Sequence, residues 1–160
     1  MIKVGEKLPE MELTLATADG PDTRSAAELF GSGKTVLFAV PGAFTPTCHL
    51  NHMPGYLTHL DAIKGKGVSR VACMSVNDPF VMKAWGESTG ALGKIDLIAD
   101  GSAVMTKAMG LDLDLTGRGL GVRSQRYAMI IEDGVVTELA VEDSPGQAET
   151  SGAEAFLAKL

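Results

Sequence analysis

Apolar and polar positions along the chain alternate in a way that predicts buried strands separated by helices. Two continuous apolar runs rich in β-branched residues, KTVLFAV (34–40) and VSRVACMSV (68–76), predict strands that are buried on both faces. A third run, KIDLIAD (94–100), predicts another strand of the same kind. Residues 126–142 contain two further apolar runs around Glu-Asp-Gly at 132–134, a sequence typical of a hairpin turn.

The stretches between these strands carry signals for the start and the end of helices. Four helices are expected: over residues 46–64 with an interruption at Pro54-Gly55, from Asp78-Pro79 through Trp85, over 102–110 up to Gly110, and after a capping-box spacing from Ser151 to Glu154. Residues 111–125 are rich in glycine and predict an irregular, functional loop. The order of elements predicts an α/β fold in which helices flank a central mixed β-sheet.

Length and composition then narrow the class of protein. A chain of 160 residues, 45% apolar and 21% charged, predicts one folded domain over residues 1–160. The net charge of −6 and the lack of a basic cluster argue against nucleic-acid binding. No apolar run approaches the ~18 residues of a membrane span, so no membrane partner is expected. The start, MIKVGEKLPEMELT, lacks the apolar core of a signal peptide, and we expect a cytoplasmic protein.

The chain contains two cysteines, Cys48 and Cys73, which are too few for a disulfide scaffold. Neither belongs to a CxxC pair, so the usual dithiol redox motif is absent. Any thiol chemistry would therefore have to begin at one cysteine acting alone.

The surroundings of Cys48 favour a negative charge on its sulfur. Thr45 can act as the N-cap of a helix, Pro46 then takes the first helical position, and Cys48 falls in the first turn. Free backbone N–H groups and the positive end of the helix dipole stabilise an anion there. From Thr35 to Leu60 the chain has no charged Asp, Glu, Lys or Arg, so no nearby carboxylate opposes a thiolate.

Other interpretations of these residues stay open at this point. Cys48 can be a buried structural cysteine, and Cys73, in the middle of a predicted strand, is more simply explained that way. A metal site made by Cys48 with His49 or His52 would need three or four ligands, so we expect no metal. His52 is either a core histidine or a partner of the thiol, because four residues along a helix place both on one face. His49 and His59 fit surface or packing roles.

The run PGAFTPTC matches a known signature. Pro41, Thr45 and Cys48 fit the P-x-x-x-T-x-x-C pattern of the peroxiredoxins, and the longer run VPGAFTPTC with H-x-PG resembles the type II, peroxiredoxin-V-like branch. The resemblance extends over nearly the whole chain, in the segments 67–86, 97–101 and 119–136. It implies a thioredoxin-like fold and a thiol peroxidase that acts on hydrogen peroxide and alkyl hydroperoxides without a cofactor.

The resemblance also implies catalytic roles. Cys48 corresponds to the peroxidatic cysteine, which attacks the O–O bond and becomes a sulfenic acid. Thr45 corresponds to the hydroxyl that hydrogen-bonds thiolate and peroxide, and Pro41 to the proline that shields the pocket from water. Arg126 corresponds to the arginine that stabilises the thiolate and the peroxide oxygens. Without the resemblance, Arg126 could not be chosen over Arg123.

Two further residues are expected to contact substrate. The backbone N–H of Thr47, in the first helical turn, can donate to the departing oxygen. His52 can lie beside the thiol and the peroxide.

The sulfenic acid has to be reduced again. The C-terminal residues 142–160 contain no resolving cysteine, and Cys73 could take part as a secondary redox residue only after local unfolding. We therefore expect a one-Cys cycle in which glutathione with glutaredoxin, or else thioredoxin, supplies the thiol. The branch resembled commonly forms homodimers. A redox sensor is the competing function, and a thiol–disulfide oxidoreductase is disfavoured because CxxC is absent.

Overall fold

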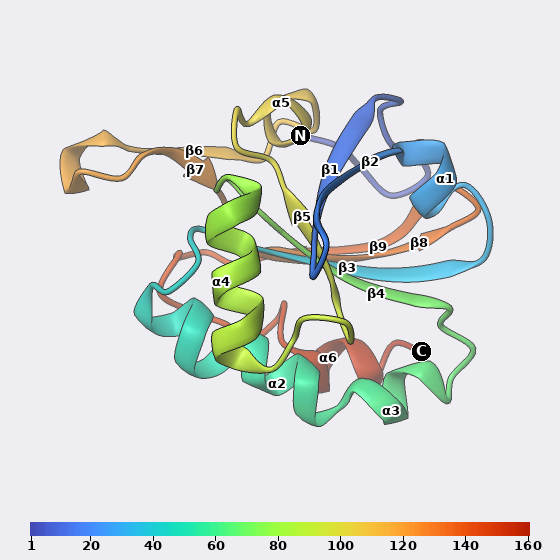
Figure 1. Cartoon of the computed structure of the whole chain (residues 1–160). Coiled ribbons are helices and arrows are strands. Elements are labelled where there is room, and N and C mark those ends of the chain that lie inside the picture. The colour runs from blue at the N-terminus through green and yellow to red at the C-terminus, as the bar shows by residue number, and fades with distance from the viewer.

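A mixed seven-stranded sheet forms the centre of the computed structural model, which describes residues 1–160 (Figure 1). The strand order is β2-β1-β5-β4-β3-β8-β9, with β3, β4 and β5 parallel and the other pairs antiparallel. The strands are β1 (Glu12–Thr17), β2 (Gly20–Ser25), β3 (Lys34–Val40), β4 (Arg70–Ser75), β5 (Asp96–Ala99), β8 (Tyr127–Glu132) and β9 (Val135–Val141). The predicted α/β fold with a central mixed sheet is confirmed.

Helices cover both faces of this sheet (Figure 1). One face packs against α2 (Met53–Thr58), α3 (Leu60–Lys64), α4 (Pro79–Thr89) and α6 (Ala153–Leu157). The opposite face packs against α1 (Ala26–Phe30) and α5 (Val104–Ala108). None of the helices is long and apolar enough to cross a membrane.

Strand β3 shows why its sequence is a continuous apolar run. Successive side chains of a strand point to opposite faces of the sheet, and here both faces are covered. Phe38 therefore packs on the α2 side, while its neighbours Leu37 and Ala39 pack on the α1 side. On β4, Cys73 pairs in register with Phe38 and lies on the same α2 side.

Two of the predicted turns and caps are confirmed in detail. Asp78 caps α4, because its Oδ1 accepts the backbone N–H groups of Phe80 and Val81. The hairpin turn between β8 and β9 places both Asp133 and Gly134 at positive φ, as a two-residue turn with the twist of the strands requires.

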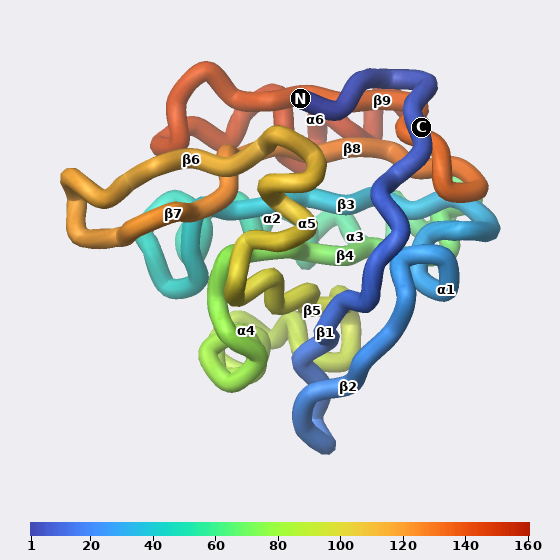
Figure 2. The backbone as a smooth tube through the Cα atoms, turned by 90° about the horizontal axis from the view of Figure 1, so that it is seen from above, coloured from blue at the N-terminus to red at the C-terminus, as the bar shows by residue number.

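The prediction of an irregular loop over residues 111–125 is wrong. These residues form a second hairpin, β6 (Asp112–Leu115) and β7 (Gly121–Ser124), joined by a 3₁₀ turn at Thr116–Arg118. Its glycines lie mainly at the tip, where Gly119 and Gly121 adopt positive φ, and the residues on either side pair as strands. The hairpin projects away from the seven-stranded sheet (Figure 2).

The expected helix interruption at Pro54-Gly55 is also wrong. The chain is helical from Pro46 to Thr58, with a π-helical segment (Cys48–His52) in which the N–H of Met53 bonds to the C=O of Cys48. Pro54 cannot donate an N–H and its ring crowds the preceding turn. The wider π segment directly before it relieves that crowding, and the helix breaks at His59 instead.

The capping box expected at Ser151 does not form. The N-cap of α6 is Gly152, and the Ser151 hydroxyl instead donates to Glu142 Oε2. A capping box does form at the start of α1, between Ser25 and Glu28. Side-chain spacing alone could not show that a tertiary partner would compete for the Ser151 hydroxyl.

Candidate active site

Cys48 lies in the first turn of the helix that follows the end of β3. The first helical hydrogen bond runs from the His49 N–H to the Thr45 C=O, at 2.9 Å. Thr45 is therefore at the N-cap position and the N–H groups of Thr47 and Cys48 precede the first helical bond, as the sequence predicted. The Thr45 hydroxyl does not cap the helix, however, because its recorded partners are the Gly42 carbonyl and the Cys48 sulfur.

Two donors meet at the sulfur of Cys48, which is fully buried. Thr45 Oγ1 and Arg126 Nη2 each lie 3.0 Å from Cys48 Sγ. One comes from the same turn, and the other from the junction of β7 and β8, 78 residues along the chain. Both interactions stabilise a thiolate more than a thiol, because a charged acceptor strengthens a hydrogen bond.

The Thr45 hydroxyl has one proton and two acceptors. Its Oγ1 is 2.6 Å from the Gly42 carbonyl oxygen as well as 3.0 Å from Cys48 Sγ. When Cys48 is a thiol, its S–H can donate to Oγ1 while the hydroxyl donates to Gly42. When Cys48 is a thiolate, the hydroxyl turns to the sulfur. Either protonation state of Cys48 is therefore accommodated without moving a heavy atom.

Arg126 is held by a different partner at each of its three side-chain nitrogens. Nη2 faces Cys48, Nε donates to the Pro145 carbonyl at 3.0 Å, and Nη1 lies 2.9 Å from His52 Nδ1. The side chain is 2% exposed, and no Asp or Glu is among its hydrogen-bond or ion-pair partners. The guanidinium charge is therefore fixed in place and remains available to an anion.

His52 lies behind Arg126. Because arginine can only donate, His52 Nδ1 must accept from it, and the ring proton is on Nε2, which donates to the Ser151 carbonyl at 2.9 Å. Burial lowers the pKa of His52 to about 4, and the charge of Arg126 acts in the same direction. The imidazole is therefore neutral at pH 7 and positions Arg126. The sequence predicted that His52 contacts the substrate. The structure places it against Arg126 instead, and it does not line the cavity beside Cys48 that is described below.

A C-terminal strap, residues 143–152, supplies most of the carbonyls that hold this network. Its carbonyls accept hydrogen bonds from Arg126 and His52. The Gly146 carbonyl also accepts one from the Thr47 hydroxyl, at 3.1 Å, and the Ser151 carbonyl accepts one from the Tyr56 hydroxyl, at 2.8 Å. Sequence reasoning missed the strap, because backbone carbonyls act here and they carry no residue-specific signal.

Glu142 ties the strap to β9. Its Oε2 accepts the backbone N–H groups of Glu149 and Ser151 and the Ser151 hydroxyl. Partial burial alone would raise the pKa of Glu142, but the hydrogen bonds from Ser151 and Glu149 outweigh it and lower that pKa. The carboxylate thus stays ionised and keeps the Ser151 carbonyl in place for His52.

A cavity of about 240 Å³ opens beside the buried sulfur. Its walls come from the loop and first turn around Cys48, from the strap and from the β6–β7 hairpin: Pro41, Thr45, Pro46, Thr47, Leu115, Arg118, Leu120, Arg126, Pro145 and Gly146. Both side chains that bond to Cys48 Sγ, Thr45 and Arg126, line it. A small polar molecule in this cavity can therefore meet the hydroxyl and the guanidinium, the two groups that bond to the sulfur.

Arg123, which the sequence could not distinguish from Arg126, has a different place. Its Nη1 donates to the Pro41 carbonyl at 3.3 Å and its Nε to the Leu120 carbonyl at 2.9 Å. It joins the Cys48 loop to the β6–β7 hairpin and makes no hydrogen bond to Cys48. His49 packs as expected, since its ring stacks on Phe44 and its Nδ1 accepts the Trp85 indole N–H.

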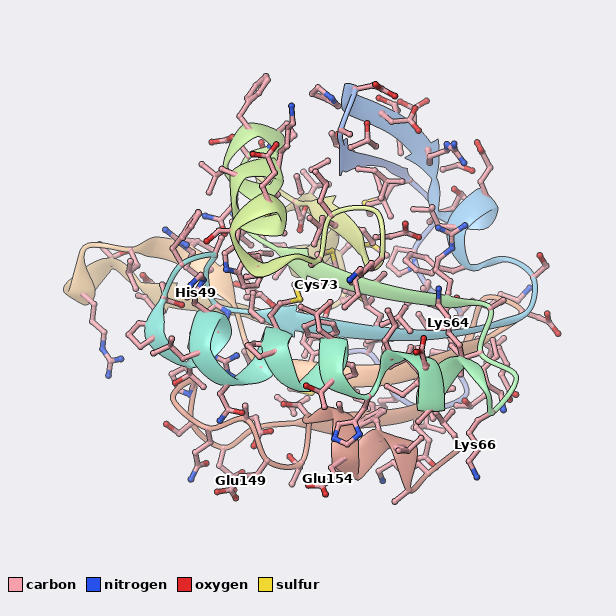
Figure 3. The ribbon with its side chains drawn as sticks, turned by 60° about the horizontal axis from the view of Figure 1, so that its bottom comes forward. His49, Lys64, Lys66, Cys73, Glu149 and Glu154 are labelled. Atoms are coloured by element: carbon pink, nitrogen blue, oxygen red, sulfur yellow. The ribbon has the colours of Figure 1, made fainter.

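Cys73 is fully buried in β4, on the sheet face against which the Cys48 helix packs, and Figure 3 shows it in the interior, over the helices of that face. Burial raises the pKa of Cys73 well above its usual value, and the nearby charge of Cys48 raises it further. Both cysteines are free thiols. No three His, Cys, Asp or Glu side chains gather closely enough to hold a metal ion.

The low pKa of His52 predicts an acid-dependent loss of stability. His52 takes up a proton near pH 6.5 in the unfolded chain but only near pH 4 in the folded protein. Stability is therefore lost as the pH falls from about 6.5 towards 4. His52→Gln keeps an acceptor for Arg126 and a donor for Ser151 but does not titrate. Between about pH 7 and pH 5, we expect the free energy of unfolding in urea to fall more steeply for the wild type, by up to about 1.4 kcal/mol per pH unit. Equal slopes would contradict a buried, neutral His52.

Comparison with known proteins identifies the family. A family model described as Redoxin matches residues 3–157. The chain is 49% identical to Peroxiredoxin-2E-2, chloroplastic, of Oryza sativa subsp. japonica, over 99% of this chain and 72% of that protein. It is 43% identical to Peroxiredoxin-2B of Arabidopsis thaliana, over 99% of this chain and 98% of the relative. The crystal structure of reduced Prx3 from Vibrio vulnificus in complex with H₂O₂ superposes with a TM-score of 0.93 at 53% identity, covering 99% of both chains. The chain therefore belongs to the Redoxin family, as a thioredoxin-fold peroxiredoxin of the type II branch and hence a thiol peroxidase.

Proposed function

We propose that this peroxidase reduces hydrogen peroxide and alkyl hydroperoxides through a sulfenic acid at Cys48. The observation that carries the proposal is the pair of donors, Thr45 Oγ1 and Arg126 Nη2, each 3.0 Å from Cys48 Sγ. The same two side chains line the adjoining cavity, so both can also contact a bound peroxide. A redox sensor needs a reactive thiol but has less need of groups that position the peroxide.

The reaction follows from this arrangement. The Cys48 thiolate attacks one peroxide oxygen, an S–O bond forms and the O–O bond breaks. Cys48 becomes a sulfenic acid, and the other oxygen leaves as hydroxide or alkoxide and takes up a proton. Arg126 stabilises the negative charge as it moves from sulfur to the departing oxygen, and Thr45 aligns the peroxide.

Pro41 and Thr47 complete the walls of the cavity. Pro41 is buried and has no N–H, so it excludes water without adding a donor. The Thr47 hydroxyl is engaged by the Gly146 carbonyl, which leaves the backbone N–H of Thr47 as its donor for the departing oxygen.

We propose a one-Cys cycle. Resolution by Cys73 would need a thiolate, access and an in-line approach to the Cys48 sulfur. Cys73 is fully buried in a central strand, and its raised pKa keeps it protonated. An external thiol would instead attack the sulfenic acid to give a mixed disulfide and water. A second thiol would then release Cys48 and form a disulfide with the first.

Glutathione with glutaredoxin is the reductant we favour over thioredoxin. Cys48 is fully buried, and the cavity beside it measures only about 240 Å³. A small tripeptide thiol can enter such a space more readily than a cysteine on the surface of another protein. We place the cycle in the cytoplasm, where thiols are kept reduced.

The catalytic roles are tested by the rate at which reduced protein gains one oxygen atom, followed by intact mass after rapid quenching. We expect Cys48→Ser to show no gain, and Arg126→Lys and Thr45→Val to slow the gain, by roughly 100-fold or more for Arg126. Arg123→Lys is the matched control and should stay within a few-fold of wild type, since Arg123 does not contact the sulfur. Equal slowing at Arg123 and Arg126 would contradict the assignment.

The one-Cys cycle is tested with Cys73→Ala, which adds no polar group to the core. After one equivalent of peroxide, we expect wild type and variant alike to gain one oxygen atom. Both should turn over with glutathione and glutaredoxin at rates within about twofold. Loss of two hydrogens in the wild type, or loss of turnover in the variant after normal oxidation, would show that Cys73 resolves the sulfenic acid.

We also propose a homodimer formed through exposed apolar side chains near the site. Phe44 is 49% exposed, Leu50 is 75% exposed on the π segment, and Phe80 is 70% exposed at the start of α4. His49, stacked on Phe44 and bonded to Trp85 of α4, links the helix that carries Cys48 and Leu50 to α4. Such a patch favours burial against a second copy.

Phe80→Asp tests this dimer by light scattering coupled to size-exclusion chromatography. We expect wild type at twice the chain mass of 16.7 kDa and the variant at or near the monomer mass. Val104→Asp is the control, because Val104 is also exposed, at 57%, but lies on α5 on the opposite face of the sheet. A monomeric wild type, or two variants that behave alike, would rule this surface out.

A further inference from the structure

The cavity beside Cys48 differs in charge from the other sizeable cavities of the protein. Its lining includes two arginines, Arg118 and Arg126, and no carboxylate. Four other cavities each include at least one Asp or Glu. One of them is the cavity of about 440 Å³ beside α6, which is lined by Glu149 and Glu154 (Figure 3). In a chain with a net charge of −6, this one cavity is suited to an anion.

No interaction within the protein explains the position of the Arg118 side chain. It ends the 3₁₀ turn at the tip of the β6–β7 hairpin, is exposed, and makes no hydrogen bond or ion pair with another residue. Arg123 and Arg126, by contrast, are held by backbone carbonyls. On the same hairpin, the Asp114 carboxylate accepts hydrogen bonds from the N–H and the hydroxyl of Thr116. It makes no ion pair with the Arg118 guanidinium.

The hairpin also gives the cavity its apolar wall. Leu115 and Leu120 are half-buried, and both line the cavity with Arg118. The Leu120 N–H bonds to the Leu115 carbonyl at 3.1 Å, which closes the hairpin and holds the two leucines at the same level. The hairpin side of the cavity therefore combines hydrocarbon with a free positive charge.

Hydrogen peroxide has no group that the hairpin side of the cavity would bind. It is served by Thr45 and Arg126 at the sulfur end, and it has neither carbon atoms for the leucines nor a negative charge for Arg118. An organic hydroperoxide that reacts at the same sulfur must place its organic group elsewhere in the cavity, and the hairpin supplies the remaining wall. A small amphipathic anion matches that wall in both polarity and charge.

We propose that the β6–β7 hairpin is a specificity element for organic hydroperoxides that carry a carboxylate. Leu115 and Leu120 contact the hydrocarbon part, and Arg118 pairs with the carboxylate. The cavity volume of about 240 Å³ is enough to hold a small organic group between its walls. The proposal rests on the proposed reaction at Cys48 and adds the class of substrate that reacts there.

The test compares cumene hydroperoxide with a para carboxylate and its methyl ester, which keeps the organic group and the hydroperoxide but has no negative charge. For the wild type, we expect kcat/KM to favour the carboxylate by roughly two- to fivefold, the range that an exposed ion pair supports. Arg118→Gln should remove this preference and leave the rate with hydrogen peroxide unchanged, while Arg118→Lys should retain part of it. The preference should also shrink as ionic strength rises.

Arg24→Gln is the matched control, because it removes the same charge from an exposed arginine on β2, outside the cavity. It should keep the wild-type preference, which separates a local contact from the net charge of the protein. Normal turnover of hydrogen peroxide without a carboxylate preference, or an equal loss in Arg24→Gln, would overturn the hairpin proposal alone. No oxidation of Cys48 by any peroxide would instead overturn the proposed function beneath it.

Discussion

The buried guanidinium of Arg126 is the constraint on which the rest of the site depends. A charge removed from water is costly unless it is hydrogen-bonded, and here each of the three side-chain nitrogens has a partner: a carbonyl, a neutral imidazole and the cysteine sulfur. A carboxylate in their place would neutralise the arginine and weaken its attraction for a thiolate. Neutral partners hold the side chain rigidly while leaving its charge for Cys48 and for a peroxide oxygen.

The need to hold Arg126 with neutral partners explains the roles of His52 and of the strap. His52 can serve Arg126 only as a neutral ring, and burial keeps it neutral. The strap can serve only if its carbonyls stay in place, and Glu142 fixes them by binding the backbone at Ser151. The interactions that build the site are thus mostly between a side chain and a backbone group, and they place the donors before any peroxide binds.

The sheet decides which residues can meet. Cys48 and Cys73 lie on the same face, yet they face different surroundings: Cys48 is bonded by two donors, and Cys73 is enclosed by apolar side chains in a central strand. The β6–β7 hairpin, outside the main sheet, adds a wall to the same cavity without contributing to the core. Because Leu115, Arg118 and Leu120 of this wall make no hydrogen bond to Cys48, Thr45 or Arg126, substrate preference can change at these residues without disturbing the chemistry at sulfur.

The sequence by itself determined β3, β4, β5, β8 and β9, the start of α4 and the position of Cys48 in a first helical turn, because these depend on local apolar runs and caps. It did not indicate β1, β2, β6 or β7, which carry no comparable apolar run. It also indicated Thr45 and Cys48 as neighbours, since they are three positions apart in one helical turn. It could not choose Arg126 over Arg123 without the family resemblance, because the two are charged residues only three positions apart and nothing local distinguishes them. Only the tertiary structure decided that Arg126 reaches the sulfur, that His52 stands behind it and that the strap holds both. The contacts of Arg126 with Cys48 and His52, and of His52 with Ser151, join residues 74 to 99 positions apart, and the strap contributes backbone carbonyls, which no residue type indicates.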